Sequence, residues 1–174
     1  MNNPFIHLRS LSSYSLSEST LKISNLVDLA KKNDMPAIAI TDNNNMFGVF
    51  EFSKECVKNN IQPIIGTSIN LLDIIVNNQI SQVTFLVKNE IGYRNLLELS
   101  SLSHLNKGNN IGVYFSQLEK FSEGLFCYFG GEFNPLLLLN KENKNKDIIQ
   151  LIGNFKKVFK QNFLFEIQRI NDQN

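Results

Sequence analysis

Short apolar runs alternate with segments in which apolar residues recur at helical spacing along most of the chain. The helical segments place their apolar residues on one face, whereas the short runs are bounded by polar residues and turn formers. The pattern predicts strands at residues 5–8, 37–41, 63–66, 68–76, 83–87, 124–129 and 163–167. It predicts helices at residues 21–32, 47–58 and 147–159, with a further helix that begins after Asn89 and contains Tyr93, Leu96, Leu97 and Leu99.

Polar residues mark where several of these elements begin and end. Ser19 or Thr20 is expected to cap the first helix, and Pro36 ends it. Asn89 is expected to cap the third helix, and the pair at residues 77–78 is expected to form a turn between strands. The phenylalanines of the second helix, Phe47, Phe50 and Phe52, are interpreted as core residues, with contact to a partner as the alternative.

The repeated order of strand, helix and strand predicts an α/β fold with a largely parallel sheet or barrel. In such folds, functional sites are built at the carboxyl ends of the strands. The loops that follow Leu8, Thr41, Gly66 and Val87 are therefore the places to look for chemistry.

Composition narrows the function without identifying it. With 174 residues, 43% of them hydrophobic and 19% charged, the chain is long enough for one ordinary globular domain. A formal net charge of +1 excludes nucleic-acid binding by bulk electrostatics. The longest apolar runs, such as residues 136–139, are too short to cross a membrane.

The cysteines, Cys56 and Cys127, stand in no metal-ligand spacing. The first residues have neither the charged start nor the apolar stretch of a secretory signal. We therefore expect reduced thiols buried in the core of a cytoplasmic protein.

Four ordered segments carry a resemblance to a known family. Residues 5–16 read FIHLRSLSSYSL, residues 35–48 read MPAIAITDNNNMFG, residues 61–66 read IQPIIG, and residues 88–96 read KNEIGYRNL. In order and spacing they resemble the amino-terminal PHP domain of bacterial DNA polymerase III alpha subunits. The family patterns are F-V-H-L-H-x-H-T-x-Y-S-L, P-A-x-A-I-T-D-H-G-N-M-F-G, I-K-P-I-I-G and K-N-E-x-G-Y-x-N-L. Residues 122–125 and 165–169 agree more loosely.

The resemblance implies the fold and the domain organisation. It implies an α/β fold, a partial distorted (β/α) barrel of the PHP type. Residues 1–174 would be the amino-terminal portion of a PHP domain, and thus a piece of a much longer polymerase subunit. The last expected strand is followed by no obvious closing helix, which is consistent with such a piece.

The chain departs from the family at its metal-ligand positions. Active PHP sites hold divalent metals with histidine and carboxylate side chains at strand ends. The chain has other residues at five of these positions, namely Arg9, Leu11, Asn43, Ser68 and Gln82. The acidic residues that remain are Asp42 and, near a position where the family often has aspartate, Glu18.

These departures predict a segment with no catalytic residue and no metal. Leucine has no donor atom, and arginine would place a permanent positive charge where cations bind. For Asp42, either a lone cation or an ion pair with Arg9 remains open as a partner. His7 precedes the ligand pair and is interpreted as structural, and His104 is interpreted as a solvent-facing residue at the end of a helix. The asparagines at 43–45 are interpreted as a turn.

The resemblance implies DNA-templated DNA synthesis for the full-length protein, a nucleotidyltransferase whose polymerase site would use Mg²⁺. This domain would be structural and would dock a proofreading exonuclease subunit. Its partners would be the remaining domains of the alpha subunit, the replisome and, through the full-length protein, DNA. The alternatives are a metal-dependent PHP phosphoesterase or 3′-5′ exonuclease using Mn²⁺ or Zn²⁺, and a free-standing interaction domain unrelated to replication.

Overall fold

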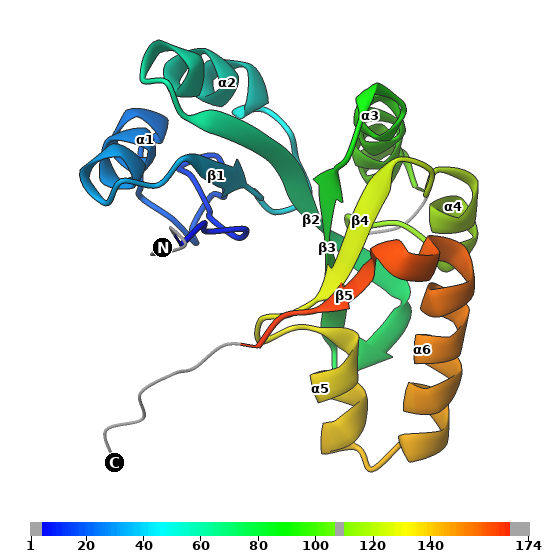
Figure 1. Ribbon diagram of the computed structural model, residues 1–174. Coiled ribbons are helices and arrows are strands. Elements are labelled where there is room, and N and C mark those ends of the chain that lie inside the picture. The colour runs from blue at the N-terminus through cyan, green and yellow to red at the C-terminus, as the bar shows by residue number, and fades with distance from the viewer. Residues whose placement is uncertain (1–4, 107–109, 168–174) are drawn as a thin grey trace, which may run out of the picture.

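The computed structural model describes residues 5–106 and 110–167 of the chain. A five-stranded sheet in the order β1-β2-β3-β4-β5 curves into an open half-barrel with helices along its outer side (Figure 1). Its strands are β1 (Ala37–Ile40), β2 (Gln62–Val76), β3 (Gln79–Val87), β4 (Leu125–Phe129) and β5 (Phe163–Phe165). The helices are α1 (Ile23–Lys32), α2 (Val49–Lys58), α3 (Glu90–Leu105), α4 (Phe115–Lys120), α5 (Pro135–Lys141) and α6 (Asn145–Phe159), with a 3-10 turn, η1, at Lys160–Asn162. The predicted α/β fold with a partial barrel is confirmed.

The sheet is mixed, so the expectation of a largely parallel sheet is wrong at its centre. β1 runs parallel to β2 and β4 runs parallel to β5, but β3 is antiparallel to both of its neighbours. The predicted turn at Asn77 and Asn78 explains the reversal, because both residues have positive φ angles, 50° and 62°. Two such residues favour a tight hairpin, and a hairpin joins antiparallel strands.

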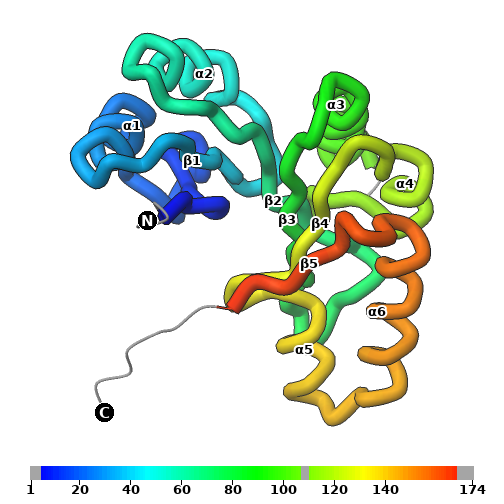
Figure 2. Tube along the Cα trace, viewed as in Figure 1, coloured from blue at the N-terminus to red at the C-terminus, as the bar shows by residue number. Residues whose placement is uncertain are grey.

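Two hydrophobic clusters divide the molecule into lobes that share β2 (Figure 2). In the amino-terminal lobe, α1 and α2 pack on β1 around Val27 and Phe52. In the carboxyl-terminal lobe, α3 to α6 pack on the other strands around Phe85 and Phe155. The sequence divided β2 at Gly66, but the structure has one strand that crosses from the first lobe to the second.

Several local expectations are confirmed and others are wrong. Asn89 caps α3 as predicted, because its side-chain oxygen accepts a hydrogen bond from the Gly92 N–H at 3.0 Å. Lys22, rather than Ser19 or Thr20, occupies the cap position of α1. The Ser19 hydroxyl donates instead to the Leu11 carbonyl at 3.1 Å and so holds the preceding loop.

Only some of the residues predicted to lie in the core are buried in the structure. Cys56 and Cys127 are fully buried, as expected, and so is Phe52. Phe47 and Phe50 are 69% and 75% exposed, so the prediction that they belong to the core is wrong. Helical spacing predicts which face of a helix a side chain occupies. Only the packing of α2 on β1 decides which of those faces is covered.

The segment before α1 replaces the first predicted strand. The carbonyl of His7 accepts a hydrogen bond from Ala39 at 2.9 Å, and the carbonyl of Ser10 accepts one from Thr41 at 2.8 Å. The segment thus lies beside β1 without forming a regular strand of its own. These bonds place Arg9, between His7 and Ser10, beside the carboxyl end of β1.

Candidate functional site

Polar side chains from several elements meet where β1 and β5 end. Asn43 follows β1 and forms an isolated parallel bridge with Ser68 of β2. Gln82 lies in β3, which runs in the opposite direction, and Glu166 directly follows β5. This is the edge of the sheet at which the altered metal-ligand positions were expected from the sequence.

A chain of side-chain contacts joins these positions. Arg9 donates from Nη1 to Glu166 Oε2 at 3.2 Å and from Nη2 to Gln82 Oε1 at 3.4 Å. Gln82 in turn donates from Nε2 to Asn43 Oδ1 at 3.1 Å, and Asn43 donates to a Glu18 oxygen. Residues that lie up to 157 positions apart in the sequence therefore form one polar cluster.

Asp42 lies beside this cluster but belongs to a separate set of contacts. Its carboxylate accepts hydrogen bonds from the Ser12 N–H at 2.7 Å and from the hydroxyls of Ser12 and Ser15, both at 2.6 Å. The residue is only 2% exposed. The possible Arg9–Asp42 pair is wrong, because Arg9 pairs with Glu166 while neutral donors of the serine loop satisfy Asp42.

The other two altered positions, Leu11 and Ser68, have ordinary packing roles. Leu11 lines a hollow beside Leu21 and Ile38. The Ser68 hydroxyl is fully buried and shares a 2.8 Å hydrogen bond with the Thr84 hydroxyl. Ser68 thus joins β2 to β3.

The chemistry of this donor set does not fit a divalent metal cluster. Such clusters need several imidazole and carboxylate donors directed at one point. Here the arrangement places a guanidinium, amides and a hydroxyl at that edge, and both Asp42 oxygens already accept hydrogen bonds. Within residues 5–106 and 110–167, no three His, Cys, Asp or Glu side chains are grouped closely enough to hold one ion.

Sequence reasoning missed Glu166, which belongs to the cluster, and Tyr128, which lies near it. Glu166 lies in a segment that matches the family only loosely. An acidic residue at the end of a predicted strand is nevertheless a signal for a functional site. Tyr128 of β4 had no signal. Its hydroxyl donates to the Leu8 carbonyl at 2.8 Å. Burial, followed by the nearby Glu166 carboxylate, raises the pKa of Tyr128, so its hydroxyl stays protonated and remains a donor.

The two histidines lie outside the cluster. The exposed His7 ring packs edge-on against Phe5 at 4.8 Å, and its backbone joins β1. The His104 ring is hydrogen-bonded to the Asn44 carbonyl at 2.8 Å and stacks on Phe47. The structural interpretation of His7 agrees with these contacts, and His104 is exposed, as expected. Asn45 also has the predicted turn role, since its oxygen accepts from the Phe47 N–H at 3.1 Å.

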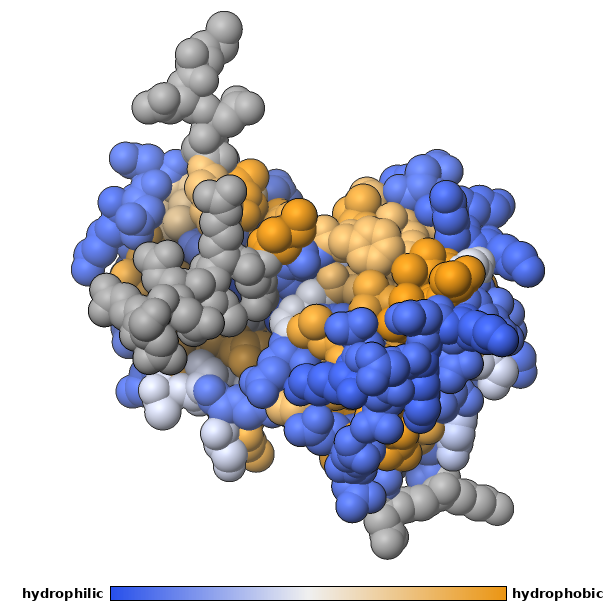
Figure 3. Space-filling view, turned by 90° about the horizontal axis from the view of Figure 1, so that it is seen from below, coloured by the Kyte–Doolittle hydropathy of each residue, from blue (hydrophilic) through white to orange (hydrophobic). Residues whose placement is uncertain are grey.

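An apolar groove continues from the polar cluster along the inner side of the sheet. It has a volume of about 630 Å³. It is lined by residues 5–9, called the first segment below, and by side chains of β3 and β4 and around β5, including Leu86, Phe126 and Leu164. Seen from below, the molecule exposes apolar surface between polar flanks (Figure 3).

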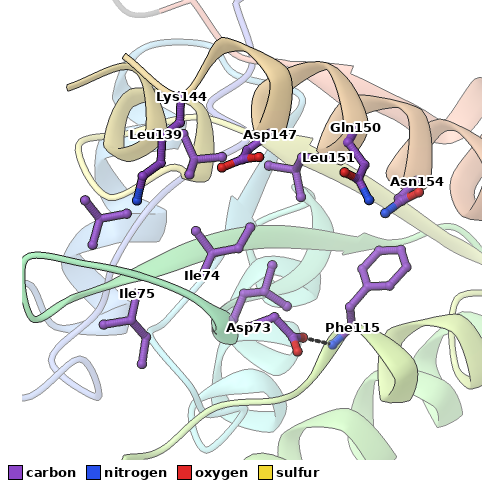
Figure 4. Close-up of a pocket in the computed structure, with 12 residues that line it drawn as sticks. Asp73, Ile74, Ile75, Phe115, Leu139, Lys144, Asp147, Gln150, Leu151 and Asn154 are labelled. Atoms are coloured by element: carbon purple, nitrogen blue, oxygen red, sulfur yellow. Dashed lines mark hydrogen bonds between the residues drawn. The ribbon is translucent and has the colours of Figure 1, made fainter. Parts of the chain in front are cut away.

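A second cavity, of about 410 Å³, lies on the other side of the carboxyl-terminal lobe. Figure 4 shows α6 side chains, among them Asp147 and Gln150, facing Ile74 and Asp73 of β2. The Asp73 carboxylate accepts a hydrogen bond from the Phe115 N–H and so anchors α4. The cavity lies between α6 and the end of β2, and the hydrogen bond from Phe115 to Asp73 at its edge is structural.

Comparison with known families gives a match over most of the chain. The model of the PHP domain matches residues 7–170. Curated relatives are DNA polymerase III alpha subunits. That of Borreliella burgdorferi is 39% identical over 97% of this chain, and that of Rickettsia prowazekii is 38% identical over 97%. That of Buchnera aphidicola is 34% identical over 100%. The chain spans 14 to 16% of the length of these relatives.

Solved structures give only distant similarities. An amidohydrolase from Chromobacterium violaceum shares 15% identity at a TM-score of 0.42, covering 57% of this chain and 32% of that one. A putative metal-dependent phosphoesterase from Bifidobacterium adolescentis shares 16% identity at a TM-score of 0.41, with the same coverage.

No helix in the described part of the chain is long and apolar enough to span a membrane.

The four ordered motifs, the curved sheet and the position of the polar cluster at its strand ends agree with the family match. The chain belongs to the PHP domain family, and it is similar over nearly its whole length to a segment of bacterial DNA polymerase III alpha subunits.

Proposed function

We propose that this chain is a catalytically inactive PHP domain of a replicative DNA polymerase III alpha subunit. The observation that carries the proposal is the Arg9 guanidinium, which stands at a ligand position of the family and pairs with Glu166. The full-length protein would carry out DNA-templated DNA synthesis in the cytoplasm, with Mg²⁺ at a polymerase site elsewhere in the chain. DNA would be contacted through that full-length protein, since this segment has a net charge of only +1.

Within that assembly the domain would dock the proofreading exonuclease subunit. Large exposed apolar side chains on the amino-terminal lobe support a docking role: Leu16 is 82% exposed, Phe47 69% and Phe50 75%. Phenylalanine is enriched at protein–protein interfaces, so exposed side chains of this kind support contact with a partner.

The second candidate is a metal-dependent phosphoesterase or 3′-5′ exonuclease. The carboxylates Glu18, Asp42 and Glu166, which stand at or near the strand edge, favour it. Their contacts count against it, because both Asp42 oxygens accept from serines and Glu166 pairs with Arg9.

Elemental analysis after equilibration with Zn²⁺ and Mn²⁺ separates the two candidates. It should be carried out on the full-length subunit and on a version of this chain that is extended to the whole PHP domain. We expect no stoichiometric metal at this domain. Two or three tightly held ions per PHP domain would overturn the proposal and would make a phosphoester hydrolysis assay the next experiment.

Pull-down with the exonuclease subunit tests the docking role. We expect capture by the parent protein and weaker capture by Phe50→Asp. Ile149→Asp is the matched control, because Ile149 is 72% exposed on α6 of the other lobe. Failure of the parent protein to capture the subunit would contradict docking, and an equal loss in both variants would place the contact elsewhere.

A further inference from the structure

The Arg9–Glu166 contact differs from an ordinary surface ion pair in its position. The side chains of Arg9 and Glu166 are 20% and 23% exposed, whereas those of the helical pair Arg94 and Glu90 are 76% and 78% exposed. It also joins the first segment to the end of β5. Exposed pairs such as Arg94–Glu90 contribute little to stability because water screens them.

The backbone after β4 leaves room for this pair. A Cβ atom added at Gly130 would overlap the Glu166 carboxylate, and one added at Gly131 would overlap the Arg9 guanidinium. Gly131 also has a φ of +75°, which side-chain-bearing residues rarely adopt. Both glycines therefore form a wall against which the two charged groups lie.

Two further residues, Gln82 and Tyr128, hold Arg9 in place from the other sides. Gln82 is turned so that its oxygen faces Arg9 while its amide nitrogen donates to Asn43. Tyr128 fixes the backbone immediately before Arg9 through its hydrogen bond to the Leu8 carbonyl. A planar guanidinium suits such a site, because its N–H groups can serve two acceptors at once.

We infer that this strand edge is a guanidinium-binding site filled by the protein's own Arg9, which acts as a tethered cation and fastens the first segment to β5. This goes beyond the proposed function, since docking and catalytic inactivity hold whether or not Arg9 stabilises the fold. It predicts that a shortened Arg9 leaves a vacancy that accepts a free guanidinium ion.

Thermal unfolding with chemical rescue tests this inference. Arg9→Ala should lower the Tm by about 4 °C, because a domain of this size shifts by roughly 2–4 °C per kcal/mol. Methylguanidinium at about 10 mM should restore part of the loss, because a small ligand with few polar contacts binds with a Kd of about 1 mM. Arg94→Ala is the matched control and should show neither the loss nor the rescue.

Sodium chloride and tetramethylammonium at the same concentration separate binding from ionic strength. A Tm for Arg9→Ala equal to that of the parent would overturn the inference. An equal rise with sodium chloride, or an equal rise of the parent with methylguanidinium, would also overturn it. Stabilisation of Arg9→Ala by Zn²⁺ or Mn²⁺, but not by methylguanidinium, would show a masked metal site instead.

A second variant keeps the test decisive if Arg9→Ala does not fold. Glu166→Gln keeps the shape of the side chain and removes its charge, so it should lower the Tm in the same direction. An unchanged Tm in Glu166→Gln would overturn the inference on its own. When the two changes are combined in a folded double variant, the methylguanidinium rescue should be lost. The metal analysis and the pull-down report on the proposed function separately from these results.

Discussion

Two carboxylates at the same strand edge have different surroundings. In the serine pocket, formed by Ser12, Ser15 and Asp42, every donor comes from a loop that lies within 30 residues of the carboxylate. In the arginine seam, formed by Arg9, Gln82, Gly130, Gly131 and Glu166, the contacts connect the two ends of the described chain. The serine pocket is therefore a local feature of one lobe, whereas the seam depends on the whole sheet.

This difference shows that carboxylates at one strand edge can be satisfied in two ways. Asp42 accepts hydrogen bonds from neutral donors, the hydroxyls of Ser12 and Ser15. Glu166 is supplied with a cation from the other end of the fold. The strand edge thus carries one local and one long-range set of contacts, each of which can be broken separately.

The largest effect is expected from Asp42→Ala. It leaves the buried Ser12 and Ser15 hydroxyls without their shared acceptor, so we expect a loss of about 3 kcal/mol in the free energy of unfolding. Urea denaturation measures this loss. Asp28→Ala, at an exposed position of α1, is the control and should change the free energy by less than about 0.5 kcal/mol. Similar losses in both variants would mean that the serine pocket is not a stabilising feature.

Gly130→Ala should have the next largest effect, a loss of about 2 kcal/mol, because its Cβ would displace Glu166. The loss should shrink in a Glu166→Ala background, and a double-mutant cycle measures that coupling. Gly153→Ala in α6 is the control. Its Cβ would meet nothing within 4 Å, and a helical alanine should stabilise by about 0.5–1 kcal/mol. Additive losses at residues 130 and 166 would contradict contact between them.

The smallest effect concerns the thiols, one in each lobe. Burial, and next the nearby Glu55 carboxylate, raises the pKa of Cys56 to about 12, and burial also raises the pKa of Cys127. The raised folded-state values favour the protonated thiols, so their contribution to stability is present below pH 9. It is lost as the pH rises from the unfolded value near 9 toward the folded values.

Urea denaturation between pH 8 and pH 10 measures this trend, with a Cys56→Ala and Cys127→Ala double variant as the control. The parent should lose more stability than that variant over the interval. Rapid reaction of the folded protein with a thiol reagent at pH 8 would show that the thiols are accessible and would contradict the expected protection.

The sequence by itself determined most of the helices and strands, the cap of α3 and the turn between β2 and β3. Asn89 and the Asn77–Asn78 turn act through contacts with near neighbours, so local chemistry was enough to predict them. The altered positions Arg9, Asn43 and Ser68 were located differently, through the resemblance of the ordered motifs to the PHP family.

Only the tertiary structure decided the direction of β3, the exposure of Phe50 and the partner of Arg9. Sequence spacing fixes which face of an element a side chain occupies, but it does not fix which element covers that face. The Arg9–Glu166 pair spans 157 residues, and it forms only when the curved sheet brings the ends of β1 and β5 together. Long-range pairing of this kind is decided by the closure of the sheet, which local pattern does not encode.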